Sequence, residues 1–336
     1  MQDKSTSVEL SYADKVLSMI WANLGPVKDL YDTASIDEIQ INAPHEIYIR
    51  ERGVDTLTSI SLDPDRLDAA CTAIASYNDK TIARKVTTSQ AERQRYILSA
   101  KLPGVRLEVA MPPVAVRGIS LCIRKHNPKI ITLEEYIEQG VITKGQAKLL
   151  TEIAARSETF IVSGPTYSGK TTLVNTIINS IPQDKRLFLI EQISELKIAE
   201  GRNHVRIECD PEHGITAETA LKAAMRFSPS WIINGELRGQ EAINFLEAAN
   251  TGHAGGTTIH ANSARDALER LEDLCLQAQR SITEHGLKSR IARSINWVIH
   301  IELTEYGRRI TGLIKITGRT ESTNSYTYED MTAYEA

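Results

Sequence analysis

The sequence predicts an α/β protein in which a larger domain with a mostly parallel sheet follows a smaller α+β domain. Three observations lead to this prediction. The chain has 336 residues, which is long for a single hydrophobic core. Its first part contains short strands of alternating apolar and polar residues. Its second part alternates apolar strands with helices, which is typical of a parallel sheet covered by helices.

The first domain is expected to span residues 1–126. A helix is predicted over residues 12–24, where apolar side chains recur on one helical face. Gly25-Pro26 ends this helix, and Asp63-Pro64 opens a second one that runs to about Tyr77. Alternating segments predict four strands: 36–42, 46–50, 106–110 and 119–124.

Asn127-Pro128-Lys129 indicates a linker, which we place at residues 127–131. The second domain is expected over 132–316, and its first helix begins with a capping box at Thr132 and Glu135. A polar tail, 317–336, is expected to fray. The predicted helices are 143–156, the segment from Leu173, 216–226, 240–249, 264–279 and 283–292, and the predicted strands are 160–163, 187–191, 231–234, 257–260, 297–303 and 309–316.

Composition narrows the class of protein. Apolar residues make up 41% and charged residues 24%, as in a water-soluble globular protein. No apolar run is long enough to span a bilayer, and Met1–Ser5 lacks the pattern of a signal peptide. The four cysteines are scattered, which indicates reduced thiols and not a metal site. The net charge of −4 gives no basic footprint for nucleic acid.

The segment Gly164-Pro165-Thr166-Tyr167-Ser168-Gly169-Lys170-Thr171-Thr172 lies between an apolar strand and a helix. That order is the context of a phosphate-binding loop. Glycines let successive N–H groups point at phosphate oxygens, and the helix N-terminus adds its positive dipole end. Lys170 would reach the β- and γ-phosphates of ATP, and the Thr171 hydroxyl would bind Mg²⁺.

Three carboxylates are candidates for holding the metal ion or activating water next to the bound phosphate. Glu191 closes a predicted strand and could hold metal-bound water, and Glu195 lies just beyond it. Glu236 follows the apolar strand 231–234, the form of a Walker B element. It is our first choice for orienting the attacking water or acting as the general base, and it could also hold Mg²⁺ through water. The alternative for each is an ordinary solvated or helix-capping acid.

Two histidines lie in the glycine-rich segment 251–263. His260 follows a short strand and could donate a hydrogen bond to the γ-phosphate, which would couple the nucleotide to movement. His253 could serve the same role from the end of a helix. A structural role for either histidine stays open, and zinc ligands at suitable spacing are absent from the sequence.

These residues resemble the type II/type IV secretion ATPase superfamily. The resemblance covers most of residues 155–275 and includes four boxes in order, and segments 36–42 and 47–50 are similar to the N-terminal domain of that family. The sequences of 235–239 and 258–263 favour the conjugation and type IV secretion branch. The boxes are Walker A at 164–172, an acidic box at 189–196, Walker B at 232–238 and a His box at 252–260.

The resemblance implies a RecA-like ATPase that binds ATP and Mg²⁺ and forms a homo-hexamer. The ring would contact inner-membrane components of a secretion or conjugation machine, peripherally, at the cytoplasmic face of the bacterial inner membrane. Arg106 and Arg124 would reach the nucleotide from the first domain, and Arg238 adds a further nucleotide-binding candidate. Direct sequence-specific binding of nucleic acid is not expected.

Two departures from the family pattern keep other functions open. Tyr167 stands where the family usually has glycine, and Gln192 stands where it usually has aspartate. These departures favour, as an alternative, a nucleotide-gated structural ring with weak turnover. A type II secretion or type IV pilus motor is a second alternative. A nucleic-acid motor is a third, which the acidic net charge argues against.

Overall fold

The computed structural model describes residues 11–51, 53–83, 96–125, 130–278 and 282–334. The chain divides into two units, residues 1–128 and 129–336. The division falls inside the segment 127–131 that the sequence marks as a linker. Residues 126–129 of that segment lie outside the described part of the chain.

The first unit contains one antiparallel sheet of six strands in the order β3-β2-β1-β6-β5-β4. Helices α1 and α3 pack on one face of this sheet, where they share a core with the inward side chains of the strands. Its elements are α1 (Tyr12–Leu24), α2 (Val27–Asp32), β1 (Glu38–Ala43), β2 (Glu46–Glu51), β3 (Val54–Leu57), α3 (Pro64–Tyr77), β4 (Ile97–Leu102), β5 (Val105–Ala110) and β6 (Ser120–Lys125).

The second unit contains an eight-stranded sheet in the order β14-β13-β12-β7-β11-β10-β8-β9. The six strands from β12 to β9 are parallel, and β13 and β14 continue the sheet in antiparallel hairpins. The strands are β7 (Phe160–Ser163), β8 (Leu187–Glu191), β9 (His204–Glu208), β10 (Trp231–Asn234), β11 (Ala254–Ile259), β12 (Trp297–Thr304), β13 (Gly307–Thr320) and β14 (Ser325–Asp330).

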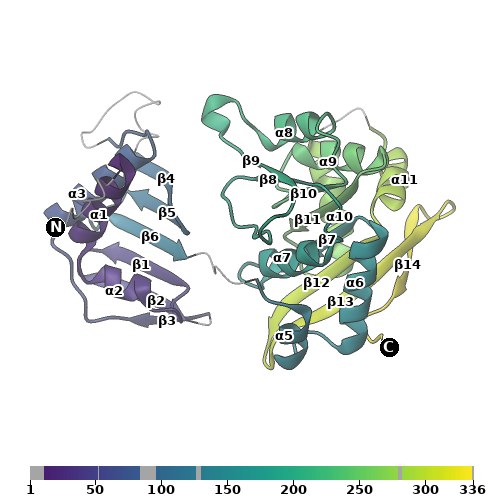
Figure 1. Ribbon diagram of the computed structural model, residues 1–336, viewed down its shortest axis with the longest axis horizontal. Coiled ribbons are helices and arrows are strands. Elements are labelled where there is room, and N and C mark those ends of the chain that lie inside the picture. The colour runs from purple at the N-terminus through teal and green to yellow at the C-terminus, as the bar shows by residue number, and fades with distance from the viewer. Residues whose placement is uncertain (1–10, 52, 84–95, 126–129, 279–281, 335–336) are drawn as a thin grey trace, which may run out of the picture. The chain divides into compact units, whose positions relative to one another are not determined.

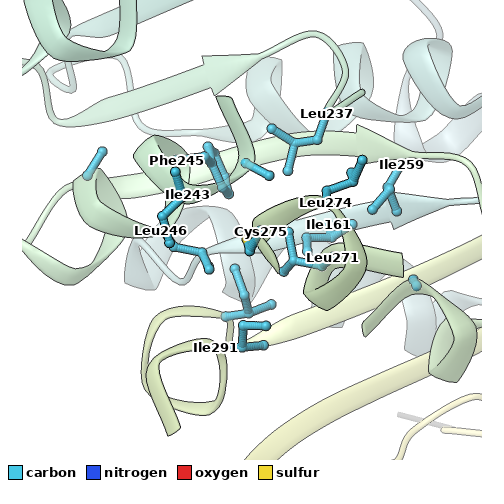
Figure 2. Close-up of a cluster of buried hydrophobic side chains, with 14 of the residues drawn as sticks. Ile161, Leu237, Ile243, Phe245, Leu246, Ile259, Leu271, Leu274, Cys275 and Ile291 are labelled. Atoms are coloured by element: carbon cyan, nitrogen blue, oxygen red, sulfur yellow. The ribbon is translucent and has the colours of Figure 1, made fainter. Parts of the chain in front are cut away.

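Helices cover both faces of this second sheet (Figure 1). One face packs against α5 (Leu133–Glu138), α6 (Lys144–Arg156) and α7 (Lys170–Ser180). The other face packs against four helices through a separate apolar cluster, part of which Figure 2 shows. These helices are α8 (Ala217–Ala224), α9 (Glu241–Asn250), α10 (Ala264–Ala278) and α11 (Glu284–Ser294). The predicted α/β fold with a largely parallel sheet is therefore confirmed.

Strand β11 carries two consecutive glycines because aromatic rings occupy the space beside its backbone. A Cβ atom on Gly255 would lie 2.8 Å from the Phe245 ring of α9. A Cβ atom on Gly256 would lie 2.6 Å from the Phe160 ring of β7. Real Cβ atoms do not approach other atoms so closely, so glycine is required at both positions.

The structure corrects the prediction that the chain frays from residue 317. Strand β13 continues to Thr320, and β14 pairs with it in antiparallel register. The segment is polar, but Tyr326 and Tyr328 pack against the buried cluster below them. Pairing with β13 and this packing order a segment whose composition alone suggests a loose tail.

Candidate active site

The loop between β7 and α7 turns the chain sharply at the carboxyl edge of the sheet. Three of its residues have positive φ: 154° for Gly164, 64° for Tyr167 and 98° for Gly169. A Cβ on Gly164 would lie 2.1 Å from the carbonyl oxygen of Ile301, so only glycine fits there. Tyr167 adopts the left-handed conformation, which residues with a side chain rarely take.

The N-terminus of α7 is open toward this loop. Its N-cap is Gly169, no side chain caps it, and its first turn carries no acidic residue. Lys170 Nζ donates to the carbonyl oxygens of Gly164 and Pro165, at 3.0 and 2.7 Å. Within the described part of the chain, the buried Ser168 hydroxyl has no hydrogen-bond partner. An open helix N-terminus, a lysine and an unpaired buried donor together fit a bound phosphate group.

Glu236 lies between two cationic or basic side chains. Its Oε1 is 3.0 Å from Nε2 of His260, and its Oε2 is 2.8 Å from Nε of Arg238. Nδ1 of His260 is 3.3 Å from Nζ of Lys170. Burial and the positive charge of Lys170 lower the pKa of His260, against the opposite effect of Glu236, and so favour the neutral ring. The imidazole therefore links the lysine of the phosphate loop to the Walker B glutamate.

Two amide side chains support this turn after β10. The Asn234 amide donates to the backbone carbonyl of Glu236 at 2.7 Å. The Gln192 side-chain oxygen accepts from Arg238 at 3.3 Å. Arg238 is thereby held by a carboxylate on one side and by a neutral amide on the other.

Glu191 is almost completely buried, and both of its carboxylate oxygens have protein partners. Oε1 accepts the backbone N–H groups of Glu195 and Leu196 at 2.8 and 2.7 Å. Oε2 pairs with Arg206 of β9 at 3.0 Å. Burial raises the pKa of Glu191, against the opposite effect of these amides and of Arg206. Glu191 holds the loop that carries Glu195, and its role toward Mg²⁺ stays a prediction.

Thr171 and Thr172 lie in the first turn of α7. The hydroxyl of Thr171 is the predicted ligand of Mg²⁺. Among the described residues, no group of three or more His, Cys, Asp and Glu side chains is placed to hold a metal ion. Mg²⁺ usually keeps several waters and takes substrate phosphate oxygens with one or two protein ligands. A hydroxyl ligand from Thr171 and a carboxylate such as Glu236 acting through water fit that mode of binding.

His253 lies apart from this cluster, and its contact with the nucleotide stays a prediction. Strand β11 is parallel to β7, and Ile259 pairs with Ser163, so His260 emerges beside the loop. His253 precedes the same six-residue strand and emerges at the opposite edge, about 20 Å away. There its Nδ1 is 3.2 Å from the Thr251 hydroxyl.

Arg106 and Arg124 lie in the first unit, on the neighbouring strands β5 and β6. They are direct partners in the antiparallel register, so they lie on the same face of the sheet. Glu38 of β1 is the partner of Arg124 on its other side. Their contact with a nucleotide held by the second unit stays a prediction.

Sequence reasoning missed three side chains around the loop. Nδ1 of the buried His300 is 2.9 Å from the Ser163 hydroxyl, directly before the loop. Arg206 holds Glu191, and Arg308 of β13 donates to the carbonyl of Tyr167 at 3.3 Å. No local pattern marks these residues, because each reaches the site from a strand that is distant in sequence.

The fold and this site define the class of protein: a P-loop ATPase, with its phosphate loop after an internal strand of a parallel sheet and a glutamate at the end of a neighbouring strand. The family described as "Type II/IV secretion system protein" matches residues 22–315, and the chain belongs to that family. No described helix is long and apolar enough to cross a membrane.

Individual relatives agree with this family. The conjugal transfer protein TrbB of Rhizobium radiobacter is 32% identical over 301 residues, which cover 85% of each chain. The type IV secretion system protein PtlH of Bordetella pertussis is 35% identical over 72% of this chain and 77% of its own length. The predicted branch, conjugation and type IV secretion, is confirmed. The structure of the pilus retraction motor PilT with ADP shares the fold, with a TM-score of 0.61, 18% identity and coverage of 94% of this chain and 85% of PilT.

Proposed function

We propose that this protein is an ATP-hydrolysing motor that powers type IV secretion or conjugative DNA transfer. The observation that carries the proposal is the linked set Lys170, His260 and Glu236 at the open N-terminus of α7. It joins a phosphate-binding group to a carboxylate that can activate water. Similarity to TrbB and PtlH supports the choice of secretion and conjugation as the work that is driven.

In this mechanism Lys170 leaves the carbonyls of Gly164 and Pro165 and binds the β- and γ-phosphates. Thr171 would hold Mg²⁺ directly, and Glu236 and Glu191 would hold it through water. When bound there, Mg²⁺ would supply positive charge that stabilises the phosphate oxygens in the transition state. Glu236 orients the attacking water and accepts its proton.

His260 is the residue through which the nucleotide acts on the rest of the unit. It now contacts Glu236 at 3.0 Å and lies 3.3 Å from Lys170. A γ-phosphate at Lys170 offers the imidazole a charged acceptor. Its contact with Glu236 therefore changes when ATP binds and again when the γ-phosphate leaves.

We propose further that the protein works as a homo-hexamer bound peripherally to inner-membrane components of its machine. Family membership and the division into two units support this assembly. Arg106 and Arg124 of the first unit would reach the nucleotide, where a permanent charge and a forked donor suit phosphate. ATP hydrolysis would then move one unit against the other.

The test compares wild type with Lys170→Ala and Glu236→Gln. We expect Mg²⁺-dependent hydrolysis in wild type, loss of nucleotide binding in Lys170→Ala, and loss of turnover with ATP binding retained in Glu236→Gln. Glu218→Gln on the exposed surface of α8 is the control and should keep full activity. Light scattering with and without nucleotide measures the mass of the particle and so the number of its subunits.

Full hydrolysis in both site variants would refute the mechanism. A six-subunit particle that binds ATP without turning it over would favour the nucleotide-gated ring. In that case Tyr167→Gly and Gln192→Asp test whether the two departures from the family pattern suppress turnover. DNA-stimulated hydrolysis with a steep salt dependence would favour the nucleic-acid motor.

A further inference from the structure

Arg308 lies against the outer side of the phosphate loop. It is the second residue of β13, opposite Leu303 in the β12–β13 hairpin, and β12 is the strand next to β7. Its guanidinium donates to the carbonyl oxygen of Tyr167 at 3.3 Å. A Cβ placed on Gly169 would lie 3.3 Å from Cδ of Arg308, so the aliphatic part of the side chain follows the loop.

The peptide group that joins Tyr167 to Ser168 is held at both ends. Arg308 binds its carbonyl oxygen, and the N–H of Ser168 lies 3.4 Å from the carbonyl oxygen of Pro165. That same carbonyl accepts a hydrogen bond from Lys170 at 2.7 Å. The orientation of this peptide is thereby connected to the lysine that binds phosphate.

This peptide follows a residue in a strained conformation. Tyr167 has φ of 64°, which glycine adopts freely and residues with a side chain avoid. Such a conformation persists only where neighbouring groups determine it. The Arg308 hydrogen bond fixes the carbonyl of the strained residue itself.

We propose that Arg308 is a positioning residue for the phosphate loop, which it keeps in its nucleotide-binding conformation by holding the Tyr167 carbonyl. The inference rests on ATP binding by this loop, as in the proposed function. Arg308 acts through the loop and does not touch the nucleotide. Its contribution compensates for the tyrosine at a position that suits glycine, so replacing that tyrosine by glycine makes Arg308 dispensable.

The test is a double-mutant cycle on nucleotide affinity. Dissociation constants for ADP and ATP are measured by titration calorimetry for wild type, Arg308→Ala, Tyr167→Gly and the double variant. We expect Arg308→Ala to weaken binding about fivefold in the Tyr167 background, as for a solvent-exposed bond from a charged donor. In the Tyr167→Gly background we expect less than about a twofold effect, because glycine holds the conformation without help.

Two further variants separate positioning from charge. Arg308→Gln keeps a planar N–H donor without the charge and should bind nucleotide more tightly than Arg308→Ala. Arg309→Ala is the matched control. Its guanidinium donates to the carbonyl of Arg308 and lies beside Gly140, away from the loop, so its removal should leave affinity unchanged.

Two results would overturn the inference. An equal loss in both backgrounds, reduced by salt and not rescued by glutamine, would mean that Arg308 binds the nucleotide charge directly. No loss in the Tyr167 background would mean that the hydrogen bond does not position the loop. Failure of ATP binding, on which the inference rests, is distinguishable, because wild type would then bind no nucleotide at all. Failure of hydrolysis alone would leave these affinities measurable. Equal melting temperatures of all variants show that the affinities report on folded protein.

Discussion

Substitution of Gly164 by alanine tests whether the phosphate loop is shaped by its contact with the β12 backbone. The added Cβ would lie 2.1 Å from the carbonyl oxygen of Ile301 and 2.7 Å from the Ser168 hydroxyl. Backbone, unlike a flexible side chain, cannot rotate away. To reach about 3.0 Å, the shortest separation that packed atoms accept, β7 and β12 must separate by roughly 0.9 Å.

That displacement acts on a buried parallel pair in which Ser163 is the partner of His300. Overpacking of this kind costs about 1–3 kcal/mol, and the φ of 154° adds strain for any side chain. We therefore expect the free energy of unfolding of Gly164→Ala to fall by about 3 kcal/mol. Nucleotide affinity should fall with it, because the loop starts at the displaced residue.

Gly201→Ala is the matched control for this substitution. Gly201 also has positive φ, 77°, but a Cβ there would meet nothing within 4 Å. Only the conformational cost of about 1 kcal/mol should appear, with nucleotide affinity unchanged. Urea unfolding and calorimetric titration with ADP measure both quantities. Equal losses of stability in the two variants would refute the argument from close contact.

Two further predictions concern the buried groups around the loop. Glu191→Gln should lower the free energy of unfolding of the second unit by about 2 kcal/mol, as measured by urea unfolding. One amide cannot replace a carboxylate that accepts hydrogen bonds from two backbone N–H groups and pairs with Arg206. A loss as small as that of the exposed Glu218→Gln would contradict this role. Burial lowers the pKa of His300, so the unfolded chain takes up a proton at higher pH than the folded chain. The free energy of unfolding should therefore fall as the pH drops below about 6.5, and this fall should be shallower in His300→Gln. The same dependence on pH in wild type and His300→Gln would contradict a contribution from His300.

Much of this fold could be predicted because its signals are local. The capping box at Thr132 and Glu135 begins a helix, as the sequence indicates, and the apolar strands of the parallel sheet are continuous runs. Strand β3 was not predicted because all four of its residues are exposed at the edge of a sheet. Strand β14 was not predicted because its order depends on pairing with β13.

The residues of the candidate site divide in the same way, into those marked by the sequence beside them and those brought in from distant strands. Glu236 and His260 could be found because each ends or follows an apolar strand, and parallel strands bring their carboxyl ends to one edge. The partners of Glu191 could not be found, since Arg206 comes from the next strand, β9. His253 precedes β11 and so lies at the end of the strand opposite His260, and its role stays a prediction.

The two glycines of β11 have a mechanical consequence. The rings of Phe245 and Phe160 fill the space beside the backbone of β11, the strand that precedes His260. This strand is therefore tightly packed against its neighbours. In the proposed mechanism, a displacement of the imidazole by a phosphate group would therefore be transmitted to α9 and to β7. On that proposal, the second unit would move as a rigid body, and its packing would carry the displacement from the site to its outer helices.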